Sequence, residues 1–253
     1  MLDSLGQISD WLVAHKVPLR QLPGALFGAR PNKLWEAATA SGLVTIYMGE
    51  YQQSLAQTHM SWISKRDAAV CNEIVRWLST PGFCGTSPPR LWFEYLPFRV
   101  DVSAKHITQK ELKRDRSAAV QKYRKMRAEL ADSSAVLIGS QRINKLVEML
   151  VADLFGCEPF KAESEVVRVP FYLAYRTQLR PVASCFGGLT NPPGVTGKFM
   201  RGMHYLDKMG QWKVFPWIDG KQDSGIVVTE EAGTKGMLLA VFGLSGRASE
   251  ALG

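Results

Sequence analysis

Three patterns are missing from this sequence, and each absence excludes a class of protein. The longest apolar run, Met237–Leu244, is far shorter than the roughly 20 residues that span a bilayer. The N-terminus has no basic region followed by an apolar stretch, so no secretory signal is predicted. We therefore expect a cytoplasmic protein without a membrane partner.

Metal-ligand spacing is the second absence. The chain has 4 cysteines and 4 histidines. No two cysteines have the close spacing of a zinc knuckle, and no histidine has a partner three or four residues away. We interpret the cysteines as buried thiols in a reducing compartment, and we predict neither a metal nor a cofactor. The residues concerned are Cys71, Cys84, Cys157 and Cys185, with His15, His59, His106 and His204.

Catalytic motifs are the third absence. The sequence contains no GxSxG nucleophile elbow and no HExxH helix. Pro192–Lys198 resembles a phosphate-binding loop, but its glycine spacing is wrong and Phe199 stands where a Ser or Thr would bind magnesium. We expect a protein that is not an enzyme, although a metal-independent ribonuclease built from scattered residues stays open.

Positive charge is concentrated near the middle of the chain. The formal net charge is +8, and residues 105–127 hold nine Lys or Arg against only Glu111 and Asp115, a local balance of +7. The acids are too few for i,i+4 salt bridges to neutralise these cations. Phosphates would supply the missing counter-charge, which predicts nucleic-acid binding. The cations are Lys105, Lys110, Lys113, Arg114, Arg116, Lys122, Arg124, Lys125 and Arg127.

The C-terminal half adds further candidate contacts. Aromatic and basic side chains are interleaved there, a composition that suits stacked bases and phosphates. The long loop region over 187–205 carries Lys198 and Arg201, which we expect to reach a nucleic-acid backbone. Near the end of the chain, Gly243–Arg247 has the pattern Gly-x-x-Gly-Arg, in which backbone amides and Arg247 can approach a phosphate.

The apolar pattern predicts an α+β fold in two parts. Residues 1–160 form a mainly helical domain with the basic helix, and residues 161–253 form an antiparallel β-rich domain with a long Gly/Pro loop. At the start, three helical patterns precede the β-branched strand 43–48. This is the element order of a winged-helix module.

Helix and strand signals place further elements. Ser64 with Asp67, and Thr108 with Glu111, resemble capping boxes, so a helix is expected after each. An apolar stripe over 143–154 ends at Gly156 and is expected to pair antiparallel with the preceding helix. Strands are predicted at 90–96 (mostly buried), 166–175 and 236–242, with pairing between 212–218 and 225–229.

Two short stretches resemble proteins of CRISPR effector complexes. Ala69-Val70-Cys71 followed by Trp77-Leu78-Ser79 is similar to the "VC…W·LS" stretch of the small Cas8-like subunit of type IV complexes. Gly243–Arg247 is similar to the glycine-rich loop of RNA-binding proteins in CRISPR effector complexes. The resemblance implies recognition of a short motif on duplex DNA beside a guide RNA, without cleavage by this subunit. The family has a cysteine pair where this chain has Cys71 alone, which puts any zinc site in doubt.

Together these features predict a non-catalytic, nucleic-acid-binding subunit of a multi-subunit ribonucleoprotein, such as a CRISPR effector subunit that contacts target DNA and guide RNA. Two alternatives stay open. A stand-alone DNA-binding protein, such as a plasmid replication initiator, would place Arg30, Asn32 and Lys33, near Trp35, in a groove. A viral matrix or capsid-type assembly protein would self-associate and bind membranes or genomes weakly.

Overall fold

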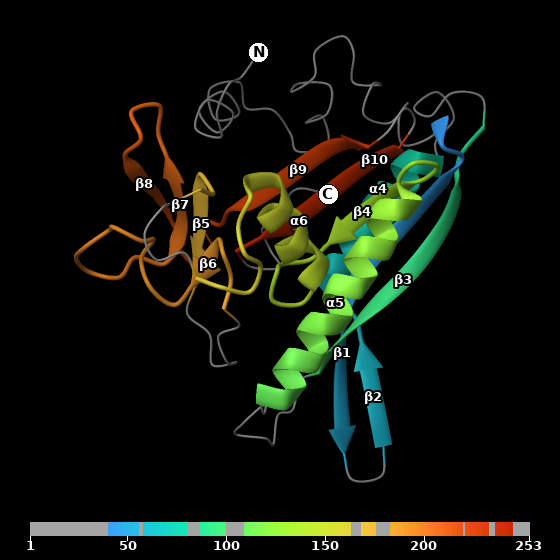
Figure 1. The fold of residues 1–253 in the computed structure, drawn as a ribbon, viewed down its shortest axis with the longest axis horizontal. Helices are drawn as coiled ribbons and strands as arrows, with labels where there is room; N and C mark the ends of the chain where they lie inside the picture. Colours follow the sequence, from blue (N-terminus) through green and yellow to red (C-terminus); the bar gives the residue numbers. More distant parts are fainter. Residues whose placement is uncertain are drawn as a thin grey trace.

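A computed structural model of the chain describes residues 40–55, 58–79, 87–99, 109–162, 168–175, 183–219, 221–232 and 236–244. Within these ranges, three helices and ten strands follow one another, and the strands form two sheets (Figure 1). The predicted mixture of helices and strands is confirmed.

The larger sheet is built mainly from parallel strands. β1 (Leu43–Leu55) lies between β3 (Arg90–Arg99) and β4 (Ser134–Ile138), and β4 pairs in turn with β10 (Gly236–Gly243). All these pairs are parallel. β9 (Gly225–Ala232) pairs antiparallel with β10. The strand order is therefore β3-β1-β4-β10-β9. The next two parallel strands in the chain, β3 and β4, lie on opposite sides of β1.

The connections explain this order. β2 (Thr58–Trp62) pairs antiparallel with the last residues of β1, and its final residue, Trp62, lies opposite Tyr51. α4 (Lys65–Ser79) begins three residues after β2 ends. The chain runs through α4 to β3 on one side of β1. It then runs through α5 (Gln109–Glu129) to β4 on the other side. The direction of winding thus reverses between β1 and β4, which makes their carboxyl ends a topological switch point.

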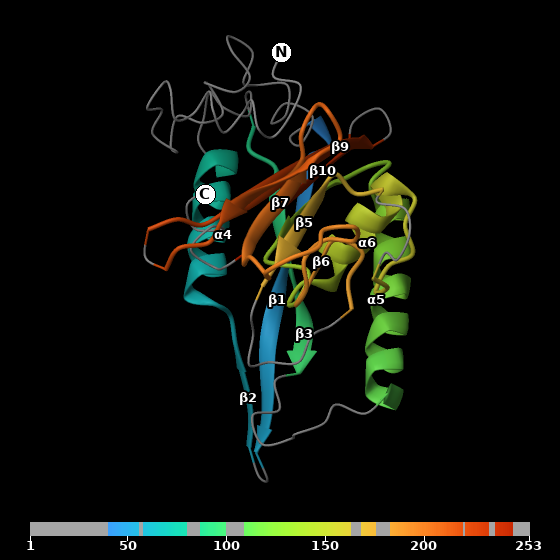
Figure 2. The same ribbon diagram turned by 90° about the vertical axis from the view of Figure 1, so that its left-hand side faces the viewer.

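Helices cover both faces of this sheet. α4 packs on one face, and α5 with α6 (Lys145–Phe155) packs on the other (Figure 2). Alternating residues of β1 follow the strand period of two: Ile46 and Met48 face α4, whereas Tyr47 belongs to the core on the α5 and α6 side. β10 is buried along its whole length because both of its faces are covered.

A smaller sheet lies between α6 and β9 in the chain. Its order is β6-β5-β7-β8, and β7 pairs antiparallel with both β5 and β8. Phe171 and Phe186 from this part pack against Phe242 of β10, with ring centroids 6.4 and 5.7 Å from the Phe242 centroid, so the two sheets share one core. The strands are β5 (Phe171–Ala174), β6 (Gly187–Gly188), β7 (Gly202–Leu206) and β8 (Trp212–Pro216).

Several local predictions are confirmed. α4, α5 and α6 coincide with three predicted helices, and Gly156 ends α6 with a left-handed φ of 65°. The strands expected at 43–48, 90–96 and 236–242 are present. The largely antiparallel character of the C-terminal strands is also present. The boundary between domains at residue 160 stays a prediction, although β9 and β10 lie in the same sheet as β1, β3 and β4.

Other expectations are wrong. Residues 212–218 and 225–229 do not pair with each other, because β8 pairs with β7 and β9 pairs with β10. The strand at 90–96 is not mostly buried: it has β1 as its only partner in the described sheet, and Trp92 is 61% exposed. The described part of residues 1–160 holds four strands beside its three helices, so a mainly helical domain is not confirmed there.

The two long helices also run in the same direction. Asp115, early in α5, pairs with Lys145 at the start of α6, whereas Tyr123, later in α5, contacts Asp153 near the end of α6. The predicted antiparallel pair is therefore wrong. The reason is β4, which carries the chain back across the molecule before α6 begins.

Some predictions lie outside the described residues. These are the winged-helix-like start with Arg30, Asn32, Lys33 and Trp35, and the positions of Cys84, Lys105 and Arg247. In the part of the chain that the structure describes, no helix has the length and apolar character required to cross a membrane.

Candidate functional site

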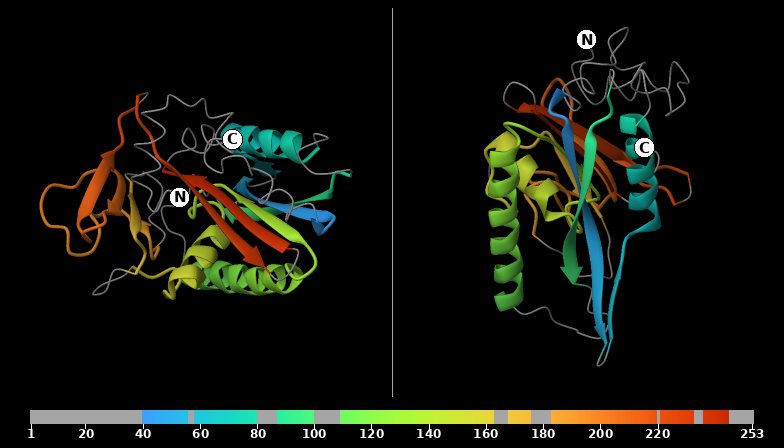
Figure 3. Two further views of the ribbon diagram at one scale, coloured as in Figure 1. Left: turned by 90° about the horizontal axis from the view of Figure 1, so that it is seen from above. Right: turned by 90° about the vertical axis from the view of Figure 1, so that its right-hand side faces the viewer.

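The outer face of α5 carries cations without acidic partners. Tyr123 and Met126 turn the inner face of the helix to the core, and α5 lies along the outside of its layer (Figure 3). Four basic side chains on the outer face are exposed, and none of them forms an ion pair with any described residue. They are Lys110, Lys113, Arg114 and Arg124.

Three of these cations lie at the unfavourable end of the helix. Lys110, Lys113 and Arg114 occupy the first two turns of α5, and Lys110 lies in the first turn, where the helix dipole is positive. A cation in the first turn is destabilising by about 0.3–1 kcal/mol at a surface position. Arg124 follows about 15 Å further along the axis, from the rise of 1.5 Å per residue. A bound polyanion would relieve this repulsion.

Three other cations of α5 have acidic partners: Lys122, Lys125 and Arg127. Lys122 forms an ion pair with Glu94 of β3, and its ammonium lies 5.7 Å from the centroid of the Tyr47 ring. Lys125 lies 3.6 Å from Glu129 on the surface of the helix, a contact that solvent and salt weaken. Lys122 is therefore fixed against the sheet, whereas Lys125 remains exposed beside Arg124.

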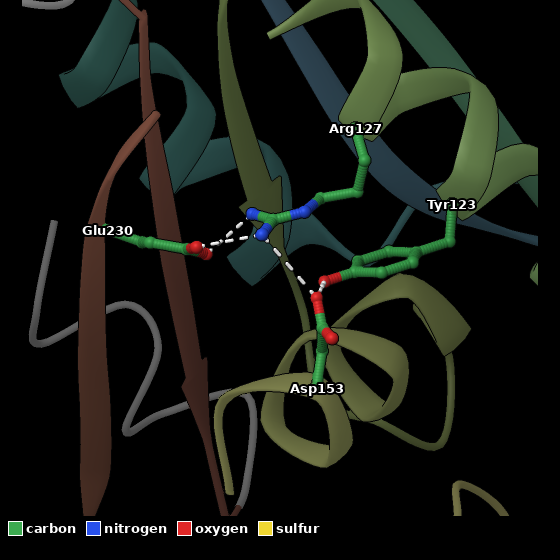
Figure 4. Close-up of polar contacts among 4 residues, drawn as sticks. All are labelled: Tyr123, Arg127, Asp153 and Glu230. Atoms are coloured by element: carbon green, nitrogen blue, oxygen red, sulfur yellow. Dashed lines mark hydrogen bonds and ion pairs between the residues drawn. The ribbon is translucent and has the colours of Figure 1, made fainter. Parts of the chain in front are cut away.

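Arg127 ties three elements together (Figure 4). Its guanidinium donates two hydrogen bonds to Glu230 of β9, at 2.7 and 2.8 Å, and lies 3.5 Å from Asp153 of α6. The Tyr123 hydroxyl donates to the same Asp153 at 2.8 Å. Burial, and then this hydrogen bond to a carboxylate, raise the pKa of Tyr123. The charge of Arg127 is thus balanced within the protein.

Arg116 turns away from the outer face. Its guanidinium carbon lies 5.6 Å from the centroid of the Phe160 ring, and the side chain is half-buried. The neighbouring Asp115 is engaged with Lys145, 3.4 Å away. Of the nine cations predicted between Lys105 and Arg127, the structure therefore groups Lys110, Lys113, Arg114, Arg124 and Lys125 on one accessible face.

The predicted loop contacts belong to a separate region. Lys198 is exposed in a loop whose shape Asn191 maintains, because the Asn191 side chain bonds the backbone at Gly197, Lys198 and Met200. Arg201 stacks on Trp217, with its guanidinium carbon 3.4 Å from the ring centroid. α6 stands between α5 and the small sheet that carries this loop (Figures 1 and 3), so the structure does not join the two groups of cations.

A second candidate site lies at the carboxyl ends of β1 and β4, which we call the switch-point site. After β4 the chain turns at Gly139, whose φ of +103° suits only glycine. The turn continues through Gln141 to Asn144, which caps α6 by accepting a hydrogen bond from the Leu146 N–H. The Asn144 amide also donates to the carbonyl oxygens of Tyr47 and Ile138, at 3.0 and 3.1 Å, and so joins β1 to β4.

Three buried polar atoms at the switch-point site have no hydrogen-bond partner among the described residues. They are Oδ2 of Asp67, Oε1 of Gln141 and the hydroxyl oxygen of Tyr175. Each of these side chains is at most 4% exposed. Buried polar groups are almost always bonded, so three such atoms around one turn require an explanation.

Close contacts hold these three side chains around the turn. A methyl group placed on Gly139 would lie 3.4 Å from Oδ2 of Asp67. One placed on Gly187 would lie 2.7 Å from Nε2 of Gln141 and 3.3 Å from the Tyr175 ring. Glycine at 187 therefore gives Gln141 and Tyr175 the space that they occupy. Burial without a counter-charge raises the pKa of Asp67 from 3.8 to about 6.

Arg142 lies beside Tyr175. Its guanidinium carbon is 5.2 Å from the Tyr175 ring centroid. Burial raises the pKa of Tyr51, the Asp67 carboxylate raises it further, and Arg142 lowers it. Tyr51 and Arg142 are only half-buried, so the cluster extends to the surface.

Sequence reasoning missed the switch-point site. Asp67 had a sufficient local explanation as a helix-capping residue, and β4, which positions Gly139, was not predicted. The Gly-Ser that ends a short apolar run at 134–138 was the available signal, since a turn after a buried strand in an open α/β sheet marks a site.

No group of three or more metal-ligating side chains occurs among the described residues. Cys71 and Cys185 are buried in the two cores and serve as small apolar residues. No known protein family, curated protein or solved structure matches the chain.

Proposed function

We propose that this chain binds nucleic acid, as a component of a larger complex, through the outer face of α5. The observation that carries the proposal is the row of exposed cations Lys110, Lys113, Arg114 and Arg124, which lack acidic partners in the described part of the chain. Lys125, whose partner Glu129 is itself exposed, extends the row.

The dimensions of α5 suit a phosphate backbone. A helix of 21 residues is about 30 Å long, so its cations can contact several successive phosphates. Each such contact releases condensed counterions, and this release is the main source of affinity in sequence-independent binding. The apolar inner face and the Arg127 network hold the helix firmly, which presents the cations on a rigid support.

Exposed aromatic side chains support a role within an assembly. β3 has β1 as its only partner among the described strands, and it exposes Trp92, Phe93 and Tyr95 at 61, 38 and 47%. Aromatic residues are enriched in the buried centres of protein interfaces. A partner subunit that covers β3 would bury these rings and leave α5 free for nucleic acid.

The resemblance to type IV CRISPR subunits stays a prediction. The residues that carry it lie in α4, where Val70, Cys71 and Leu78 are buried against the large sheet, so packing already accounts for their apolar character. Isolation of the complex from its host would test it. A discrete copurifying guide RNA would support the CRISPR assignment, and random nucleic acid would remove that assignment while leaving the α5 proposal intact.

A charge-removal experiment tests the proposal. The variant carries Lys110→Gln, Lys113→Gln, Arg114→Gln and Arg124→Gln, and the matched control loses the same charge at the exposed residues Lys161, Lys208, Lys213 and Lys221. Fluorescence anisotropy with a labelled single-stranded RNA and a labelled DNA duplex measures affinity from low to high salt.

We expect the α5 variant to bind both probes more weakly. Its plot of log K against log salt should flatten by up to about 3.6 for duplex DNA, since each of the four lost phosphate contacts contributes about 0.9 to the slope. The control should retain most of the affinity. Equal slopes for the wild type and the α5 variant would exclude this helix from the interface.

A further inference from the structure

β3 forms an open edge of the large sheet, since β1 is the only described strand that pairs with it. The Arg90 N–H donates to the Gly42 carbonyl oxygen at 3.0 Å, so the backbone groups of Arg90 point toward β1. Backbone groups alternate in direction along a strand, so Leu91, Phe93 and Tyr95 direct their N–H and C=O groups to the outer edge. Such an edge is a template for pairing with another chain.

Two prolines limit this open edge. Pro89 comes directly before the strand and Pro97 lies near its end, and neither has an N–H to donate. Pro97 is an even number of residues from the outward-directed positions, which explains why β1 continues to pair with β3 past it. A ladder of hydrogen bonds along the outer edge is therefore confined to residues 90–96. In the view from the side of β3, this strand lies between α4 and α5 (Figure 3).

The open edge is complementary to itself. In an antiparallel pair of two β3 strands centred on Phe93, this residue lies opposite its own counterpart, and Leu91 lies opposite Tyr95 of the second copy. Each outward N–H and C=O group then has a partner, and the next pair in the ladder is Pro89 with Pro97. A shift of the centre by one residue in either direction would place Tyr95 or Leu91 opposite a proline. The backbone therefore selects one register.

The same register covers the exposed rings of β3. Side chains that lie directly opposite in an antiparallel pair are on the same face of the sheet. Phe93 and Tyr95 lie on the α4 face, because they pair with β1 residues that face α4, and they meet the same strand of the second copy there. Trp92, on the other face, lies opposite Glu94 of the second copy and beside the Lys122 that pairs with it. One contact thus covers all three exposed aromatic side chains.

This arrangement places both α5 helices on one face of the joined sheets. The two-fold axis between two antiparallel strands is perpendicular to the sheet, so both copies present the same face on the same side. The four unpaired cations of each α5 therefore face the same way. A polyanion that crosses the axis contacts both rows, so nucleic acid and the dimer stabilise each other.

We propose that the chain forms a symmetric dimer by antiparallel pairing of β3 with the β3 of a second copy, centred on Phe93. The inference deepens the assembly role proposed above, and it rests on the proposed function only for the effect of nucleic acid. The pairing itself uses no unpaired cation of α5. The dimer can therefore exist without nucleic-acid binding, and one α5 can bind nucleic acid without the dimer.

Sedimentation velocity of the full chain over a concentration series tests the dimer. High salt screens the repulsion between the two rows of cations. The β3 variant carries Phe93→Lys and Tyr95→Lys, and the first change places like charges directly opposite each other. The matched control carries Leu189→Lys and Met200→Lys, at two exposed apolar side chains outside the large sheet. Thermal unfolding establishes that each variant is folded before its mass is interpreted.

We expect the wild type and the matched control to change from one chain to two as concentration rises. The β3 variant should self-associate at least tenfold more weakly. The fourfold α5 variant, which tests the proposed function, should still dimerise at high salt. A dimer in that variant together with unchanged nucleic-acid binding would remove the proposed function and leave this inference standing.

Cysteine crosslinking tests the register. Phe93→Cys places two thiols opposite each other, with Cα atoms about 5.5 Å apart, which is within the range of a disulfide. The matched control Tyr95→Cys places its two thiols about 13 Å apart along the strands. After mild oxidation, a non-reducing gel should show a crosslinked dimer for Phe93→Cys alone, with the wild type as the control for the native cysteines.

Three results would overturn the inference. They are a wild type that stays monomeric at every concentration, with or without an oligonucleotide, a folded β3 variant that self-associates as the wild type does, and equal crosslinking of Phe93→Cys and Tyr95→Cys. A monomer whose β3 becomes protected only on addition of a different protein of the complex would assign the edge to that protein instead.

Discussion

Two buried carboxylates lie in contrasting surroundings, one in α6 and one in α4. Glu148 of α6 accepts hydrogen bonds from the Phe160 and Cys185 N–H groups, at 2.9 and 2.8 Å, and from the Ser184 hydroxyl at 2.6 Å. Asp67 of α4 is almost equally buried, but its Oδ2 accepts none from the described residues. The first carboxylate joins two loops to a helix, whereas the second joins nothing that the structure describes.

The same contrast separates two amides of the turn after β4. Asn144 is fully buried, and its side chain bonds β1, β4 and α6 at once. Gln141, three residues earlier, leaves its Oε1 without a partner in the described chain. Glu148 and Asn144 therefore have structural roles that are visible in their bonds. Asp67 and Gln141 each leave a buried acceptor unpaired among the described residues, which costs stability.

The largest expected effect is a loss of stability when Glu148, which accepts three hydrogen bonds, is replaced. Glu148→Ala should reduce the free energy of unfolding by about 4 kcal/mol, because it leaves three buried donors unpaired. Glu148→Gln should lose much less, since an amide oxygen still accepts from the two backbone N–H groups. Urea denaturation of both variants measures this difference. A small loss in the alanine variant would mean that the three bonds do not hold the loops.

Replacement of Asp67, whose Oδ2 has no described hydrogen-bond partner, should raise the free energy of unfolding instead of lowering it. The rise of the Asp67 pKa from 3.8 to about 6 corresponds to about 3 kcal/mol of cost for the buried charge. Part of this cost remains for a buried amide, so Asp67→Asn should stabilise the protein by about 1–2 kcal/mol at pH 8.

The pH dependence gives this prediction its sign. Because the folded-state pKa of Asp67 lies above the unfolded value, the wild type loses stability from this group as pH rises from about 4 to about 6 and no more above that. The advantage of Asp67→Asn should therefore be small at pH 4 and largest at pH 8, measured by urea unfolding at both. An advantage that does not grow with pH would show that Asp67 has an unrecognised counter-charge.

The smallest expected effect separates two arginines of α5. Arg127→Gln should destabilise the protein by about 1 kcal/mol through loss of the partly exposed Glu230 pair, with little change in nucleic-acid affinity. Arg124→Gln should leave the unfolding midpoint almost unchanged but weaken binding and reduce its salt dependence. Thermal unfolding and anisotropy on the same two samples make the comparison. Reversed results would contradict the division between paired and unpaired cations.

Local patterns were sufficient to predict the helices. α6 was found because its apolar stripe and Gly156 form a complete local signal. The charge of α5 was likewise visible as a surplus of cations in one segment. Which of those cations are neutralised was not, because the partners of Lys122 and Arg127 come from β3 and β9, and Glu230 is 103 residues away from Arg127.

By itself the sequence determined the helical segments, several of the apolar strands though not β4, and a concentration of positive charge, since each depends on residues close together in the chain. Only the tertiary structure decided the parallel order of the large sheet, the parallel course of α5 and α6, and the approach of Asp67 to the turn at Gly139. Strand partners are chosen by burial across the whole molecule, and a strand has no local signal that names its neighbour. The switch-point site exists only after that choice has been made.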